Sequence, residues 1–291
     1  MGRADHGRCA IPGLSGGAVG GAGDSAGGVG ASTRPYESAA DAWLAGADPA
    51  YRRFADALVA AAPDPLSGLR VLDIGAGTGA ATRSLLAVGA QVWAVDESPA
   101  MLRTARGVVP GVALVAGDAT ALPFADASFD AAVSAFCINH LDQPHLLLAE
   151  AGRVVRRGGC VLASTFEEGD DHPAKAAIDS VLARWGWQQS AWHRDFHSRT
   201  SGLTATPGRL VAIGERAGLD DVRVVAVEVD TGLSTASEPV GWRLGMAEQA
   251  TFLATVPPGD RTALADEAET AVGAAPPPLI RTVLVLVARA S

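Results

Sequence analysis

The chain has 291 residues, with 23 Lys and Arg against 32 Asp and Glu, which gives a net charge of −9. This length accommodates one large domain or two small ones. An acidic chain with no basic cluster argues against nucleic acid as a partner, because binding to nucleic acid depends on neutralising phosphates. No apolar run approaches the ~20 residues needed to cross a bilayer, so no membrane association is expected.

The three cysteines, Cys9, Cys137 and Cys160, have neither the spacing of metal ligands nor that of a disulfide framework. This pattern predicts no metal site and indicates a cytoplasmic protein.

The N-terminal stretch differs in composition from the rest of the chain. Residues 13–30 are dominated by Gly, Ala and Ser and contain almost nothing large to bury. Such a segment cannot offset its ordering entropy, so residues 1–33 are predicted to be a disordered Gly-rich leader. Residues 34–291 are predicted to form one domain. It begins with helical periodicity from Tyr36 to Ala62, which Pro63 and Pro65 end.

Apolar runs and helical patterns alternate along most of the remaining chain. The runs predict strands at 69–74, 91–95, 112–116, 129–135, 159–165, 221–230 and 282–287. The helices are predicted at about 78–88, 99–107, 143–156 and 207–217, and Ser98-Pro99 is a well-formed start for the second of them. Strands that alternate with helices indicate an α/β fold with a parallel sheet and right-handed crossovers.

Two segments, 167–206 and 232–279, interrupt this alternation and are predicted to be helical insertions. The first contains four residues that are candidates for binding a substrate: Trp185, Trp192, His193 and His197. Aromatic side chains in a lid suit a flat or lipophilic small molecule. The alternatives are a hydrophobic core of the lid itself or a homodimer contact. The two histidines are four residues apart, but no third metal ligand is evident, so we interpret them as polar lid residues.

A glycine-rich turn follows the first predicted strand. The sequence Asp73-Ile74-Gly75-Ala76-Gly77-Thr78-Gly79 describes a strand that ends in a tight turn and opens a helix, where a ligand can lie against main-chain N–H groups. The spacing also fits a dinucleotide fingerprint, and thus a NAD-dependent dehydrogenase. However, Asp73, Asp96 and Asp118 place a carboxylate at three strand ends, and the turn has no basic residue. This charge pattern favours a cationic nucleoside over a pyrophosphate.

These motifs resemble those of class I S-adenosylmethionine (SAM)-dependent methyltransferases, of the small-molecule type similar to the ubiquinone/menaquinone C-methylases. The segments 117–124 and 128–134 and the tripeptide Asn139-His140-Leu141 are characteristic of that group. The resemblance extends from about Tyr36 to Ala288. It implies a Rossmann-like, seven-stranded, mostly parallel sheet with an antiparallel last strand and helices on both faces. The two insertions would form a helical lid over the carboxyl ends of the strands.

The resemblance also implies a set of cofactor-binding residues: Tyr36, Asp73, Gly75, Ala76, Gly77, Asp96, Glu97, Met101, Asp118, Ala119 and Phe136. In relatives the glycine turn faces the methionine part of SAM, the second acid binds the ribose and the third meets adenine. Tyr36 would cap the cofactor and Met101 would lie beneath the adenine ring. Plain helix packing is the alternative for both.

The expected function is the transfer of a methyl group from SAM to a small-molecule acceptor, an aromatic or isoprenoid-like specialised metabolite. An in-line displacement of this kind depends mostly on positioning. His140 is the candidate for acid–base catalysis, with structural packing against the cofactor loop as the alternative. Two other functions stay open: a non-transfer reaction such as cyclisation on the same fold, and a non-catalytic SAM-binding scaffold.

Overall fold

The computed structural model describes residues 34–169 and 172–291. The predicted leader, residues 1–33, lies outside the described residues. The strands are β1 (Arg70–Ile74), β2 (Gln91–Asp96), β3 (Ala113–Ala116), β4 (Phe129–Ala135), β5 (Val155–Phe166), β6 (Asp220–Asp230) and β7 (Ile280–Arg289). The helices are α1 (Arg34–Ala42), η1 (Trp43–Ala47), α2 (Asp48–Ala60), α3 (Ala80–Ala87), α4 (Pro99–Val108), η2 (Ile138–His140), α5 (Pro144–Val154), α6 (Pro173–Arg184), α7 (Ala191–Asp195), η3 (Phe196–Ser201), α8 (Gly202–Thr204), α9 (Pro207–Arg216), α10 (Ser237–Gly245), α11 (Ala247–Thr255) and α12 (Pro258–Val272).

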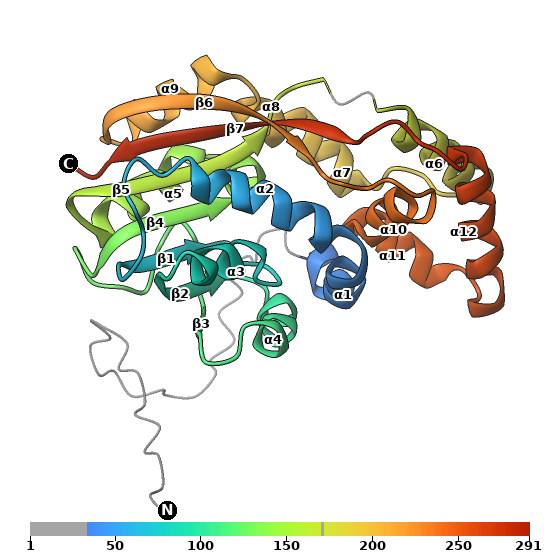
Figure 1. Cartoon of the computed structure of the whole chain (residues 1–291), viewed down its shortest axis with the longest axis horizontal. Helices are drawn as coiled ribbons and strands as arrows, with labels where there is room; N and C mark the ends of the chain where they lie inside the picture. Colours follow the sequence, from blue (N-terminus) through green and yellow to red (C-terminus); the bar gives the residue numbers. More distant parts are fainter. Residues whose placement is uncertain (1–33, 170–171) are drawn as a thin grey trace, which may run out of the picture.

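The strands form one seven-stranded sheet in the order β3-β2-β1-β4-β5-β7-β6 (Figure 1). Neighbouring strands from β3 to β5 are parallel, and β7 is antiparallel to both β5 and β6. The predicted α/β sheet with an antiparallel last strand is therefore confirmed.

Most predicted boundaries differ from the structure by one or two residues, and the largest difference is at the start of β5. The helix that was expected to reach residue 156 ends at Val154, and β5 begins at Val155, which pairs with Phe129 before the register shifts. Gly159 lies at this irregularity, where a Cβ would come within 2.5 Å of the Asp130 carbonyl oxygen. The close approach of two backbones requires glycine there, as is common at an irregularity of a strand.

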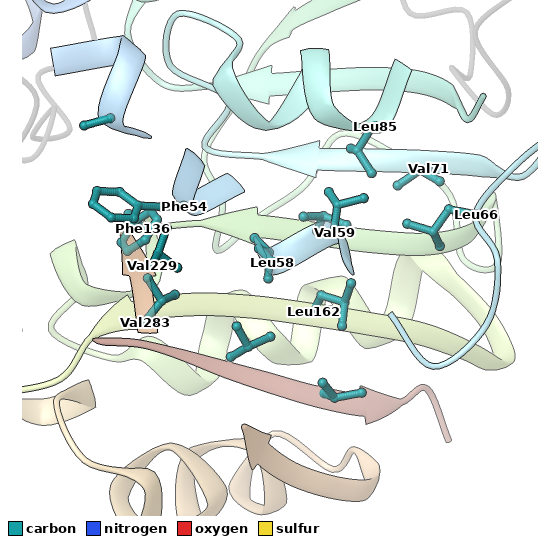
Figure 2. Close-up of a cluster of buried hydrophobic side chains, with 14 of the residues drawn as sticks. Phe54, Leu58, Val59, Leu66, Val71, Leu85, Phe136, Leu162, Val229 and Val283 are labelled. Atoms are coloured by element: carbon teal, nitrogen blue, oxygen red, sulfur yellow. The ribbon is translucent and has the colours of Figure 1, made fainter. Parts of the chain in front are cut away.

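Helices cover both faces of the sheet. On one face Phe54 and Leu58 of α2 and Leu85 of α3 pack against strand residues such as Leu162 and Val283 (Figure 2). On the other face, leucines of α5 and α9 pack against strand residues that include Leu72, Leu284 and Leu286. Full burial of one such side chain stabilises the fold by about 1.5–3 kcal/mol. These two clusters therefore hold the helices on the sheet and keep the strand ends in position.

The two insertions pack on one another at one end of the sheet (Figure 1). Ile178 and Leu182 of α6 form one buried apolar cluster with Val240 of α10 and Leu264 of α12. The insertions therefore form one helical layer with its own small core. Among the helices of the described residues, none has both the length and the apolar character required to span a bilayer.

Candidate cofactor and acceptor site

A cavity of about 660 Å³ lies at the carboxyl ends of the parallel strands. Its walls are the segments that follow β1 to β5, together with parts of α1, η1 and both insertions. Ligands of open α/β sheets bind in this position, where the strand order reverses. The cavity is therefore the candidate site for both a nucleotide and an acceptor.

The glycine turn after β1 forms one wall of the cavity. The N–H groups of Gly75 and Ala76 donate to the Val95 carbonyl oxygen at 2.8 and 3.1 Å, which ties the turn to β2. Gly75 has a φ of +73°, and a Cβ there would lie 2.5 Å from the side chain of Cys137. Gly77 also has a positive φ, +55°, but a Cβ there would meet nothing within 4 Å. The turn is thus held closely against its neighbours at Gly75 and borders open space at Gly77.

Asp96 links this turn to the start of α4. Its carboxylate accepts hydrogen bonds from the N–H of Gly77 and from the N–H of Ser98, both at 2.8 Å. Burial raises the pKa of Asp96, while these two backbone donors act in the opposite direction. A carboxylate offers about four lone-pair sites, so Asp96 can accept further hydrogen bonds from ligand hydroxyls in the cavity.

The other acidic strand ends differ from each other. Asp118 is exposed, lines the cavity, and accepts at 2.7 Å from both the N–H and the hydroxyl of Thr120. Asp73 is fully buried, does not line the cavity, and accepts from the Thr82 hydroxyl at 2.5 Å. Its Oδ1 has no hydrogen-bond partner among the described residues. Burial raises the pKa of Asp73 to about 7, so its charge responds to a cation placed nearby.

Tyr36 connects the nucleotide end of the cavity to the lid. Its ring makes edge contacts with Trp43, His140 and Trp192, at centroid distances of 5.7, 5.6 and 6.1 Å. It also packs beside Met101, which is buried and lines the cavity. Tyr36 and Met101 therefore both pack against neighbouring helices and line the cavity, so the two interpretations of these residues do not exclude each other.

His140 pairs with the same tyrosine. The Tyr36 hydroxyl lies 3.3 Å from His140 Nε2. Burial lowers the pKa of His140 to about 4 and raises that of the Tyr36 phenol, so both side chains are neutral at physiological pH. A neutral imidazole can accept a proton, and the edge contact with the Tyr36 ring helps to keep this one in place.

The low pKa of His140 predicts a pH-dependent stability. Because the folded-state value of about 4 lies below the ordinary value of about 6.5, the unfolded chain binds this proton first as the pH falls. Stability is lost between pH 6.5 and 4 and levels off below that window. Between pH 7.5 and 5.0 the wild type should lose about 2 kcal/mol more unfolding free energy than His140→Gln, as measured by urea titration. Equal losses in the two proteins would contradict the lowered pKa.

Of the lid residues that were predicted to bind substrate, some line the cavity and others do not. Trp192 and His193 line the cavity. Trp185 does not; its indole N–H donates to Glu267 at 2.7 Å and its ring packs in the core of the lid. The side chain of His197 lies outside the described residues. Within the ranges that the structure describes, no group of three His, Cys, Asp or Glu could hold a metal ion.

The remaining predicted cofactor residues also border the cavity. They are Ala76, Glu97, Ala119 and Phe136. Phe136 has a φ of +55° and stacks on Phe166 with a centroid distance of 4.3 Å. A left-handed conformation is strained for an aromatic residue and clusters at functional sites.

Several cavity residues were not predicted as site residues. Tyr51 and Phe166 line one wall, and Trp242, Met246 and Gln249 come from the second insertion. Helical periodicity is the only sequence signal for Tyr51, and that signal does not distinguish a cavity wall from a core. The second insertion carries no motif at all.

The residues that are present fit SAM. The glycine turn borders open space at Gly77, and Asp96 and Asp118 place carboxylates at two strand ends of the same cavity. No Lys or Arg lies in the turn itself, where it would pair with a pyrophosphate. These features suit a nucleoside with a positive charge.

Comparisons with known proteins agree with this assignment. Residues 72–163 match the family model of a methyltransferase domain. A demethylmenaquinone methyltransferase of Renibacterium salmoninarum is 38% identical over 127 residues, which cover 44% of this chain and 54% of the relative. One from Parafrankia sp. is 34% identical over 171 residues, 52% of this chain and 66% of the relative. The chain spans about half the length of most of the curated relatives it matches.

A solved structure shows the same fold. The protein, from Anabaena variabilis, is described as a candidate methyltransferase from an antibiotic biosynthesis pathway. It is 20% identical with a TM-score of 0.54, over 80% of this chain and 96% of that one. This structural likeness and the strand order show the fold, and the family match over residues 72–163 identifies a methyltransferase domain of the class I SAM-dependent type in this chain.

Proposed function

We propose that the protein transfers a methyl group from SAM to a small-molecule acceptor with an aromatic or isoprenoid-like body. One observation carries this proposal: a single cavity contains both the acidic strand ends, Asp96 and Asp118, and the tryptophans of the lid. A nucleotide and an apolar acceptor can therefore meet in one enclosure.

Different residues of the cavity would bind different parts of SAM. Asp96 would hold the ribose and Asp118 the adenine, while the glycine turn faces the methionine part. SAM, when bound, supplies a methyl group made electrophilic by the sulfonium. The aromatic rings of the cavity would shield the reacting atoms from water, and orientation of the two reactants can contribute about 7–11 kcal/mol to lowering the barrier. His140 lines the same cavity and is the proposed acceptor of a proton from an acceptor hydroxyl. With a pKa of about 4 its imidazole is neutral but a weak base, so its contribution depends on its position.

The acceptor class draws on the lid and on the relatives. Trp187, Trp192 and Trp242 present large rings to the cavity, and such rings bury flat molecules at little entropic cost. The matched relatives are named for demethylmenaquinone, so a quinoid ring is one class to test. The family match ends at residue 163, before the first insertion begins, so we look to the lid for the contacts that select the acceptor.

The test is incubation of the purified protein with methyl-labelled SAM and a panel of phenolic, quinoid and isoprenoid compounds. We expect label in a product from at least one class. Consumption of a compound without transfer of label would instead support a non-transfer reaction such as cyclisation. Binding of NAD in place of S-adenosylhomocysteine in a calorimetric titration would revive the dehydrogenase alternative.

His140 gives a second prediction for this reaction. His140→Gln should lower the turnover of the best acceptor at least tenfold, because general acid–base catalysis contributes about 10²–10⁴-fold. Its affinity for S-adenosylhomocysteine, measured by calorimetry, should stay within about threefold of the wild type. Parallel losses in both quantities would assign His140 to packing against the cofactor loop.

A further inference from the structure

Two polar side chains on the lid wall of the cavity have unused hydrogen-bonding groups. Gln249 of α11 is fully buried and Trp242 of α10 is 4% exposed, and both residues line the cavity. Neither amide atom of Gln249 nor the indole nitrogen of Trp242 has a hydrogen-bond partner among the described residues. They are the most completely buried of the unpartnered polar side chains on this wall.

Such an arrangement is costly in a folded protein. An unpaired buried donor or acceptor costs about 1–3 kcal/mol, and a glutamine amide brings both kinds at once. A leucine or methionine would fill the same space without that cost. Buried polar groups without partners therefore require an explanation, and a ligand group inside the cavity provides one.

The charged residues that are next to them in the sequence, Arg243 and Glu248, already have hydrogen-bond partners within the protein. Arg243 is buried and makes a two-pronged ion pair with Asp179, at 2.7 and 2.9 Å. Glu248 accepts hydrogen bonds from both the N–H and the hydroxyl of Ser190, each at 2.7 Å. Lys175 of α6 also lines the cavity, and its ammonium lies 3.9 Å from Asp179. The groups that Gln249 and Trp242 themselves present are uncharged: an indole N–H, an amide NH₂ and an amide oxygen.

The indole N–H of Trp242 and the amide of Gln249 can together bind an uncharged oxygen atom of a ligand. A carbonyl oxygen can accept from the indole or the amide NH₂, and a hydroxyl can also donate to the amide oxygen. Aromatic rings line the same cavity, with Trp192 in edge contact with Tyr36 and Phe136 stacked on Phe166.

We propose that Gln249 and Trp242 form a polar subsite that recognises a neutral hydroxyl or carbonyl oxygen on an aromatic acceptor. The proposal rests on the proposed function in taking the ligand to be the acceptor. Its test is equilibrium binding, however, so it does not depend on any methyl being transferred.

The experiment uses the full chain saturated with S-adenosylhomocysteine and three probes: naphthalene, 2-naphthol and 2-naphthoate. Binding is followed by tryptophan fluorescence for the wild type, Gln249→Met and Trp242→Phe. We expect the wild type to bind 2-naphthol at least tenfold more tightly than naphthalene and to give 2-naphthoate no comparable gain. Each variant should reduce the preference for 2-naphthol to about threefold or less while naphthalene binding is retained.

Trp185→Phe is the matched control, because this indole N–H is bonded to Glu267 in the lid core and the residue does not line the cavity. It should keep the wild-type preference. Unchanged affinity for S-adenosylhomocysteine shows that each variant is folded and that the nucleotide end is intact. A wild type that does not prefer 2-naphthol, or a preference that survives both substitutions, would overturn the subsite while leaving the methyltransferase proposal standing.

Discussion

The Asp96→Ala variant is expected to bind S-adenosylhomocysteine at least tenfold more weakly than the wild type. Hydrogen bonds to a charged group contribute about 1.5–3 kcal/mol each, and 1.4 kcal/mol corresponds to tenfold in affinity. Asp96 also accepts from the N–H groups of Gly77 and Ser98. Its removal therefore takes away the proposed ribose acceptor and loosens the glycine turn in the same step. Isothermal titration calorimetry measures the change.

The two effects of this substitution can be separated with Asp96→Asn. An amide oxygen still accepts from one backbone N–H, but the side chain loses its charge and one acceptor atom. We expect an affinity between those of the wild type and Asp96→Ala. Wild-type affinity in Asp96→Ala would refute the ribose assignment. Equal losses in both variants would show that the charge, and not the hold on the turn, dominates.

The strands and the nucleotide end were predictable because their sequence signals are local. Parallel strands buried on both faces appear as short apolar runs, as in Val71 to Ile74 and Ala131 to Ser134, and both runs became strands. Ser98 was predicted to begin a helix, and its hydroxyl accepts from the N–H of Met101 at 3.2 Å. A carboxylate after an apolar run is at the carboxyl edge of the sheet by geometry alone, which placed Asp96 and Asp118 on the cavity.

The lid was less predictable because its signals are not local. Trp185 and Trp187 are two residues apart at the end of α6, yet only Trp187 lines the cavity. The contact between Tyr36 and His140 joins residues 104 positions apart in sequence. A glutamine in a helical segment is normally interpreted as a surface residue, so nothing in the sequence marked Gln249 as buried. Such details depend on how the two insertions pack, which no periodicity describes.

A seam of glycines holds the lid against the N-terminal helices. Gly46 in η1 contacts α10 so closely that a Cβ would overlap the carbonyl oxygen of Gly241 and come within 3.0 Å of the Gly245 Cα. On the facing side, a Cβ at Gly245 would lie 2.7 Å from the Ala42 carbonyl oxygen. Backbone atoms cannot move aside as side chains do, so the seam fixes the distance between the two helices. The same two elements carry Trp43 and Trp242, which both line the cavity.

Gly46→Ala is therefore expected to destabilise the protein by about 2 kcal/mol or more, a fall in Tm of roughly 5 °C, because the added methyl group pushes α10 away from η1. Differential scanning calorimetry of the ligand-free protein measures this fall. Since α10 carries Trp242, binding of 2-naphthol should weaken more than binding of S-adenosylhomocysteine. Gly241→Ala is the matched control in the same seam: a Cβ there meets nothing within 4 Å, and alanine favours the helix by up to about 1 kcal/mol. A Tm for Gly46→Ala equal to that of Gly241→Ala would mean that the two helices separate freely, and that the seam does not set the shape of the acceptor end.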